Sequence, residues 1–145
     1  MELSKLEIEL LLDIYEMDIN LGERINENSY ELIEQDPKER RQEFIHYLLK
    51  LKRFGRIDFD ESKTFVCGGI RSEKYRTNVV MIWPENIHIL EKGIQEVEEA
   101  KKTVMDKVKE TAKQGVKEIG SKVYDEVKDW TSKTISEYFV KITKG

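Results

Sequence analysis

Apolar residues in the last third of the chain recur every eleven positions. One such series consists of Val97, Val108, Ile119 and Trp130. Eleven residues make three helical turns at about 3.67 residues per turn, so this spacing keeps the apolar side chains on one side of a long helix. A stripe of that length needs a surface to cover it, and that surface can belong to the same chain, to another protein or to a lipid layer.

No proline occurs after Pro84, and the pattern predicts a helix over about residues 85–140. If continuous, it would extend on the order of 80 Å. Gly115 and Gly120 weaken its middle, because glycine lowers helix stability by about 1 kcal/mol relative to alanine. The alternative to one rod is therefore a helical hairpin of residues 85–113 and 116–141.

Helical spacing also organises the first half of the chain. Ser4 followed by Glu7 is a capping-box pattern and predicts a helix over residues 5–17. Ser29 is a candidate cap for a short second helix. Asp36 and Pro37 then predict the start of a longer helix, whose inner face and end are set by Phe44, Leu48, Leu51 and Gly55.

After this helix the period changes from helical to extended. Residues 57–59, 64–67 and 78–83 are rich in strand-forming residues. The polar segment 71–76 separates the last two strands and predicts the tip of a β-hairpin. Pro84 ends the pairing because proline has no amide donor.

The charges divide the chain near residue 90. All seven arginines precede residue 77, whereas residues 91–145 carry 12 lysines and 11 acidic side chains. That segment is +1 and the remainder −5, giving the net charge of −4. We therefore expect a mostly α, α+β fold with a domain over residues 1–92 and an amphipathic helical extension over residues 93–145.

Two segments carry a resemblance to a known fold. Leu48-Leu49-Lys50-Leu51-Lys52-Arg53-Phe54-Gly55-Arg56-Ile57 is similar to a third helix that runs through a glycine into a first wing strand. Ile87-His88-Ile89-Leu90-Glu91-Lys92-Gly93-Ile94 looks like the start of the helix after the wing. With the element order, these segments resemble a winged-helix domain, a helix-turn-helix variant, of the small YjcQ-type proteins of Bacillus and phage origin. The resemblance covers about residues 3–95 and implies a domain that binds DNA or protein.

In most helix-turn-helix proteins the helix after the turn enters the major groove. A helical period of 100° per residue turns Gln42, Glu43 and His46 outward when Phe44 faces the core. Acidic side chains on this face, such as Glu43, oppose phosphate binding. A small basic edge remains possible there, and its candidate nucleic-acid contacts are Lys38, Arg41, Gln42, Arg71, Lys74 and Arg76.

The sequence contains no pattern of catalytic, cofactor-binding or metal-binding residues. Its two histidines, His46 and His88, are far apart in sequence, and no cysteine and histidine have the spacing of metal ligands. Cys67 is the only cysteine, and we expect it to be a buried strand thiol in a reducing compartment. The acidic N-terminus does not fit a signal peptide, and no apolar stretch is long enough to span a membrane. We therefore predict a cytoplasmic, non-enzymatic protein without cofactors.

The borders of the apolar stripe indicate its partner. One border is basic, with Lys102 and Lys109, but the other mixes Lys107 with Glu118 and Glu126. Borders of unlike charge suit helix pairing better than an anionic lipid surface. The stripe that we expect to mediate an interaction comprises Val97, Met105, Val108, Ala112, Val116, Ile119, Val123, Val127 and Trp130.

These observations favour an interaction protein, of bacterial or phage origin, whose C-terminal helix self-associates or docks on a partner protein. Two alternatives remain open from the sequence. The first is a transcription regulator that binds DNA, and the second is an effector that binds a membrane surface through the amphipathic helix. No small-molecule substrate is indicated.

Overall fold

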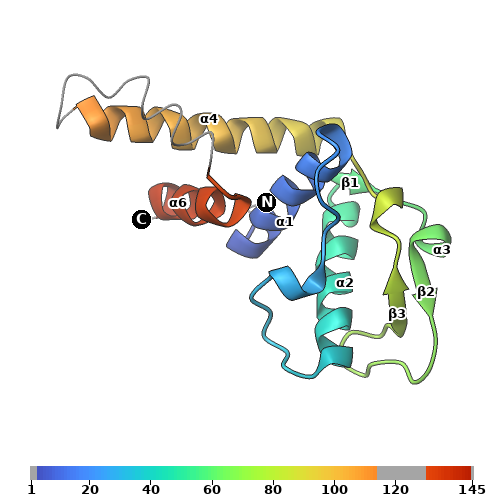
Figure 1. Ribbon diagram of the computed structural model, residues 1–145. Helices are drawn as coiled ribbons and strands as arrows, with labels where there is room; N and C mark the ends of the chain where they lie inside the picture. Colours follow the sequence, from blue (N-terminus) through green and yellow to red (C-terminus); the bar gives the residue numbers. More distant parts are fainter. Residues whose placement is uncertain (1–2, 114–129, 145) are drawn as a thin grey trace.

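The computed structural model describes residues 3–113 and 130–144, which form a mostly helical α+β fold (Figure 1). Two small antiparallel sheets of two strands each accompany the helices. The elements, in chain order, are α1 (Lys5–Ile19), η1 (Glu27–Ser29), α2 (Pro37–Arg53), β1 (Ile57–Asp58), α3 (Glu61–Thr64), β2 (Phe65–Cys67), β3 (Val79–Ile82), η2 (Pro84–Asn86), β4 (His88–Ile89), α4 (Glu91–Lys113) and α6 (Ser132–Lys144).

The predicted first and third helices are confirmed as α1 and α2. Ser4 caps α1 by accepting a hydrogen bond from the Glu7 amide, and Asp36 caps α2 in the same way. The inner face of α2 is buried as expected at Phe44 and Leu48. Gly55 follows α2 with a φ of 73°, a left-handed conformation that lets the chain turn toward β1.

The prediction of a short helix that begins after Ser29 is wrong. Ser29 instead ends the 3-10 turn η1, which Asn26 caps by accepting from the Asn28 amide. The chain then becomes extended at Tyr30, because the Tyr30 ring packs against Phe44 in the core, with ring centroids 5.5 Å apart. Tertiary packing therefore overrides the local capping signal in this segment.

The predicted hairpin is confirmed by the pairing of β2 with β3. Cys67 is exposed, however, so the prediction of a buried thiol is wrong. A register irregularity between Val66 and Cys67 interrupts the alternation of inward and outward side chains, and both residues face solvent.

The segment after Pro84 begins its helix later than expected. Residues 84–90 form η2 and the strand β4, which pairs with β1, and α4 begins only at Glu91. The Asp18 carboxylate accepts a hydrogen bond from the Ile89 amide at 2.9 Å, which holds β4 against the end of α1. This contact joins residues far apart in sequence, so no local pattern indicates it.

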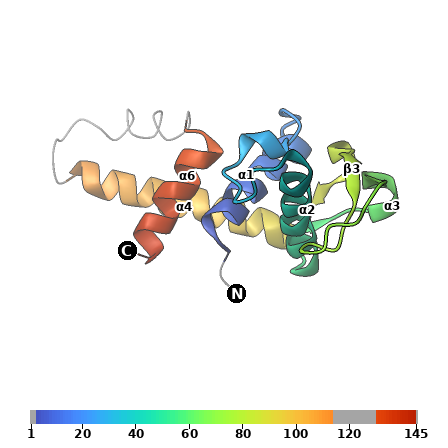
Figure 2. The ribbon, with the colours of Figure 1, turned by 90° about the horizontal axis from the view of Figure 1, so that it is seen from below.

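The C-terminal helix α6 folds back onto α4 and α1 (Figures 1 and 2). Ion pairs join Lys5 of α1 to Glu137 of α6 at 3.1 Å and Lys101 of α4 to Glu16 of α1 at 3.0 Å. The described residues therefore have the folded-back arrangement rather than one rod. Gly115 and Gly120, the proposed bend positions, lie outside the described residues.

One hydrophobic core runs through the described part of the chain. It combines residues of α1 and α2 with Val97 and Val104 of α4 and Ile135 of α6. The β2–β3 hairpin lies on the far side of α2 from α6, at the opposite end of the molecule (Figure 2).

Candidate functional site

The hairpin tip folds back over the N-terminal half of α2. Ser72 donates a hydrogen bond to the Glu39 carboxylate at 2.9 Å, and Thr77 donates to the Gln42 side-chain oxygen at 2.7 Å. The structure thus brings together the two parts of the predicted nucleic-acid edge. The tip of the hairpin packs directly against α2, so the two parts contact each other.

The prediction that the side chains of Gln42 and Glu43 face outward is wrong. Gln42 is only 1% exposed, and its side chain hydrogen-bonds to the backbone of Val79 in β3. The Glu43 carboxylate is buried too, where it accepts from the amides of Ile33 and Glu34 at 3.1 and 2.9 Å. Helical periodicity cannot show that a hairpin and a loop will cover this side of α2.

Three of the predicted basic contacts are engaged within the chain. Arg41 pairs with Glu27 at 2.9 Å and also donates to the Val80 carbonyl. Lys74 pairs with Glu34 at 2.8 Å, and this hydrogen bond lowers the pKa of the Glu34 carboxyl.

Arg71 is the third basic contact that is engaged within the chain, because its guanidinium donates a hydrogen bond to the backbone carbonyl of Arg76. Lys38 and Arg76 are exposed and form no ion pair with any described residue. The cationic edge is consequently smaller than the sequence indicated.

The hairpin exposes an apolar surface that the sequence reasoning did not identify. Val66 and Met81 lie opposite each other in the strand register and are 41% and 49% exposed. We call this set the apolar hairpin surface, and it comprises Val66, Ile70, Val80, Met81 and Trp83. The signal was present in residues 79–83, an unbroken apolar run, because a strand of that kind is usually covered on both faces.

The described part of the interaction stripe is mostly used inside the molecule. Val97 is buried, and Val108 packs against the core in the seam that α4 forms with α1 and α6. Trp130 is partly buried and meets Tyr138 of α6 edge to face, with ring centroids 5.5 Å apart.

The structure describes two further positions of the stripe. Met105 is partly exposed on α4, and Ala112 lies in the last turn of that helix. The other members lie outside the described residues, and they are Val116, Ile119, Val123 and Val127.

Neither histidine belongs to a chemical centre in the described residues. His88 is exposed, with its Nδ1 3.1 Å from an oxygen of Asp18, and His46 lies beside the rings of Tyr47 and Tyr75. Within residues 3–113 and 130–144, no group of three or more His, Cys, Asp or Glu side chains is arranged to hold a metal ion. None of the described helices has the length and apolar character needed to cross a membrane.

Comparison of the chain with protein-family models, with curated proteins and with solved structures finds no match. Among the described residues, five of the nine large apolar side chains that are exposed belong to the apolar hairpin surface.

Proposed function

We propose that this chain is a non-enzymatic interaction protein that self-associates through the apolar hairpin surface. The observation that carries the proposal is the exposure of Val66 and Met81 on facing strands, together with Trp83 at the end of β3. Aromatic residues and methionine are enriched in protein interfaces, and Val66 and Met81 lie opposite each other in the hairpin register.

A second copy of the chain is the partner that fits this surface best. Exposed charges of both signs flank β2, with Glu61 and Lys63 before the strand and Arg71 and Glu73 after it. In a two-fold contact centred on β2, the Glu61 side of each copy faces the Arg71 side of the other. A partner with charges of one sign would meet like charges on both flanks.

We further propose that residues 3–95 form a divergent winged-helix domain. The support is the order of α1, α2, the β2–β3 hairpin and α4, with Gly55 at the junction of α2 and β1. One feature departs from that fold: the 3-10 turn η1 stands in the place of a complete second helix. Winged-helix domains serve both DNA and protein binding, so fold alone does not select the function.

The DNA-binding and membrane-surface alternatives have less support. DNA contact would have to use a helix face on which Gln42 and Glu43 are buried. Lipid binding through α4 would have to expose Val97 and Val104, which lie in the core. DNA binding through the predicted edge therefore keeps only Lys38 and Arg76 as exposed contacts without an ion pair to a described residue. Lipid binding through the described part of α4 requires that helix to leave the core, whereas the hairpin surface is accessible as it stands.

The test is the solution mass by light scattering over a wide range of protein concentration. We expect a dimer for the wild-type chain and a monomer for the double variant V66K and M81K, because two lysines would have to lose their hydration in the contact. The matched control is L21K, at a position 88% exposed in a different loop, and it should remain dimeric. A wild-type chain that stays monomeric at every concentration, or a double variant that still dimerises, would overturn the proposal.

A further inference from the structure

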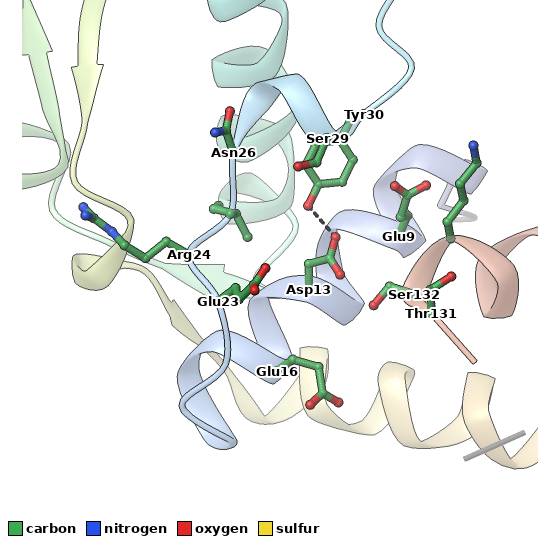
Figure 3. Close-up of a pocket in the computed structure, with 12 residues that line it drawn as sticks. Glu9, Asp13, Glu16, Glu23, Arg24, Asn26, Ser29, Tyr30, Thr131 and Ser132 are labelled. Atoms are coloured by element: carbon green, nitrogen blue, oxygen red, sulfur yellow. Dashed lines mark hydrogen bonds between the residues drawn. The ribbon is translucent and has the colours of Figure 1, made fainter. Parts of the chain in front are cut away.

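A polar cavity separates α1 from the segment before η1 and from the start of α6 (Figure 3). Its volume is about 440 Å³. Carboxylates dominate its lining, with Glu9, Asp13 and Glu16 from successive turns of α1 and Glu23 from the facing segment. α1, the segment that follows it and the start of α6, which is distant in sequence, thus converge on one acidic cavity.

The basic side chains at this cavity are already neutralised by acids. Arg24 pairs with Glu85 at 2.6 Å, and Lys133 pairs with Glu31 at 3.0 Å. Glu16 has its own partner in Lys101.

The other three carboxylates, those of Glu9, Asp13 and Glu23, have no ion-pair partner in the part of the chain that the structure describes. Tyr30 donates a hydrogen bond to Asp13 at 2.6 Å, but it brings no positive charge. The cavity therefore carries an excess of negative charge.

The Glu9 side chain gives the clearest indication that the cavity binds a hydrogen-bond donor or a cation. It is only 8% exposed, lines the cavity, and forms no hydrogen bond or ion pair with any described residue. A carboxylate that is largely shielded from solvent and has no ion-pair partner favours a hydrogen-bond donor or a cation beside it. Burial, with the nearby Asp13 charge, raises the pKa of Glu9 to about 7.

A second hollow of about 310 Å³ adjoins the cavity and shares Glu9, Ser29 and Lys133 with it. Its lining differs, because Leu6 and Ile33 add apolar surface. The two hollows thus place on either side of Glu9 an acidic recess and a hollow of mixed lining, in which Leu6 and Ile33 lie beside Lys5 and Glu31.

We propose that the two hollows form one groove for a primary alkylammonium group, with Glu9 as its anionic anchor. An ammonium has three N–H donors, which suit the carboxylates of Glu9 and Asp13, and its methylene chain would lie along Leu6 and Ile33. Two sources share this chemistry: a free linear polyamine and the side chain of a lysine.

Calorimetric titration at pH 8 with two probes, spermidine and Nα-acetyl-lysine methylamide, tests this site. We expect wild-type binding of at least one probe and about tenfold weaker binding by E9Q. The matched control is E98Q, which removes an exposed carboxylate from α4 and should bind as the wild type does. Binding of spermidine alone identifies a polyamine site, whereas binding of the lysine derivative identifies a site for lysine side chains.

A second variant guards against a folding defect in E9Q. Ser29 is exposed where the two hollows meet, so S29Y should obstruct the groove and weaken binding without disturbing the core. Wild-type affinity should also rise between pH 6 and pH 8 as Glu9 ionises, and this rise should be absent in E9Q. The other charged or titratable groups around Glu9 are Lys5, Asp13, Tyr30, Glu31, Tyr47 and Lys133.

The proposal fails if neither probe binds, if E9Q binds as tightly as the wild type, or if E98Q loses as much affinity as E9Q. The last outcome would indicate attraction to the overall negative charge rather than to a site. The groove lies away from the apolar hairpin surface, so V66K with M81K should bind both probes normally. A failure here consequently leaves the self-association proposal standing, and the reverse also holds.

Discussion

The Gln42 side chain of α2 takes the place of a neighbouring strand for Val79 of β3. Its Nε2 donates to the Val79 carbonyl at 2.8 Å, and its Oε1 accepts from the Val79 amide at 3.1 Å. The same oxygen accepts from Thr77. One buried amide therefore attaches the hairpin to α2 and closes that edge of the small sheet.

Replacing Gln42 by alanine should destabilise the protein by about 3 kcal/mol, because the backbone groups of Val79 would be left buried without partners. The free energy of unfolding from urea titration measures this. The control Q95A, on the exposed side of α4, should change it by less than about 0.5 kcal/mol. A Q42A variant as stable as Q95A would show that water replaces the amide without loss.

Glu96 should contribute to stability through its ion pair with Arg56. Its carboxylate accepts from Arg56 Nε at 2.8 Å, and Arg56 is itself buried and donates to the Phe54 carbonyl. This pair joins the end of α2 to α4. Glu96→Gln leaves the guanidinium without a counter-charge, so we expect a loss of about 2 kcal/mol in urea unfolding, against almost none for Glu98→Gln on the exposed side of α4. Equal effects of the two variants would contradict this role.

Gly93 allows α4 to begin directly against β1. A methyl group at this position would lie 2.3 Å from the Arg56 carbonyl oxygen and 2.8 Å from the Ile89 side chain. Gly93→Ala should therefore cost about 2 to 3 kcal/mol, since backbone must move. Gly68→Ala is the matched control, because its nearest neighbour would be 3.8 Å away. Thermal unfolding of both variants distinguishes a steric need for glycine at residue 93 from a general effect of alanine.

The sequence predicted elements whose signals are local and missed those fixed by contacts at a distance. Capping by Ser4 and Asp36 and the apolar spacing in α2 were sufficient to locate α1 and α2. By contrast, the acidic groove needs α6 to return to α1, and no spacing in residues 5–19 marks Glu9 as different from the other acids of that helix. Its carboxylate became a candidate site only when three elements closed around it.

Glu9 should also make stability depend on pH in a defined direction. The pKa of Glu9 is about 7 in the folded protein against 4.5 for the ordinary group, and burial is the main cause. Between these values the folded protein holds a proton that the unfolded chain has released, so this contribution to stability is complete below pH 4.5 and is lost as pH rises through 7.

Glu9→Gln removes this dependence. Its Tm should match that of the wild type near pH 4.5 and exceed it by about 5 °C at pH 8, as measured by calorimetry without added amines. Glu98→Gln should show no such trend with pH. A wild-type curve parallel to that of Glu9→Gln at all pH values would mean that Glu9 titrates normally.

Substitution of Ile135 tests whether α6 packs on its own chain or on a second copy. It is buried where α6 packs on α1 and α4, and Ile135→Ala should cost about 3 kcal/mol through the cavity it leaves. Lys141→Ala, at an exposed position of α6, should have little effect.

The comparison is made in a chain that also carries V66K and M81K, so that hairpin contacts between copies do not contribute. There the loss from Ile135→Ala should be independent of protein concentration, because the partners of Ile135 belong to the same molecule. A loss that changes with concentration would instead place α6 against a second copy.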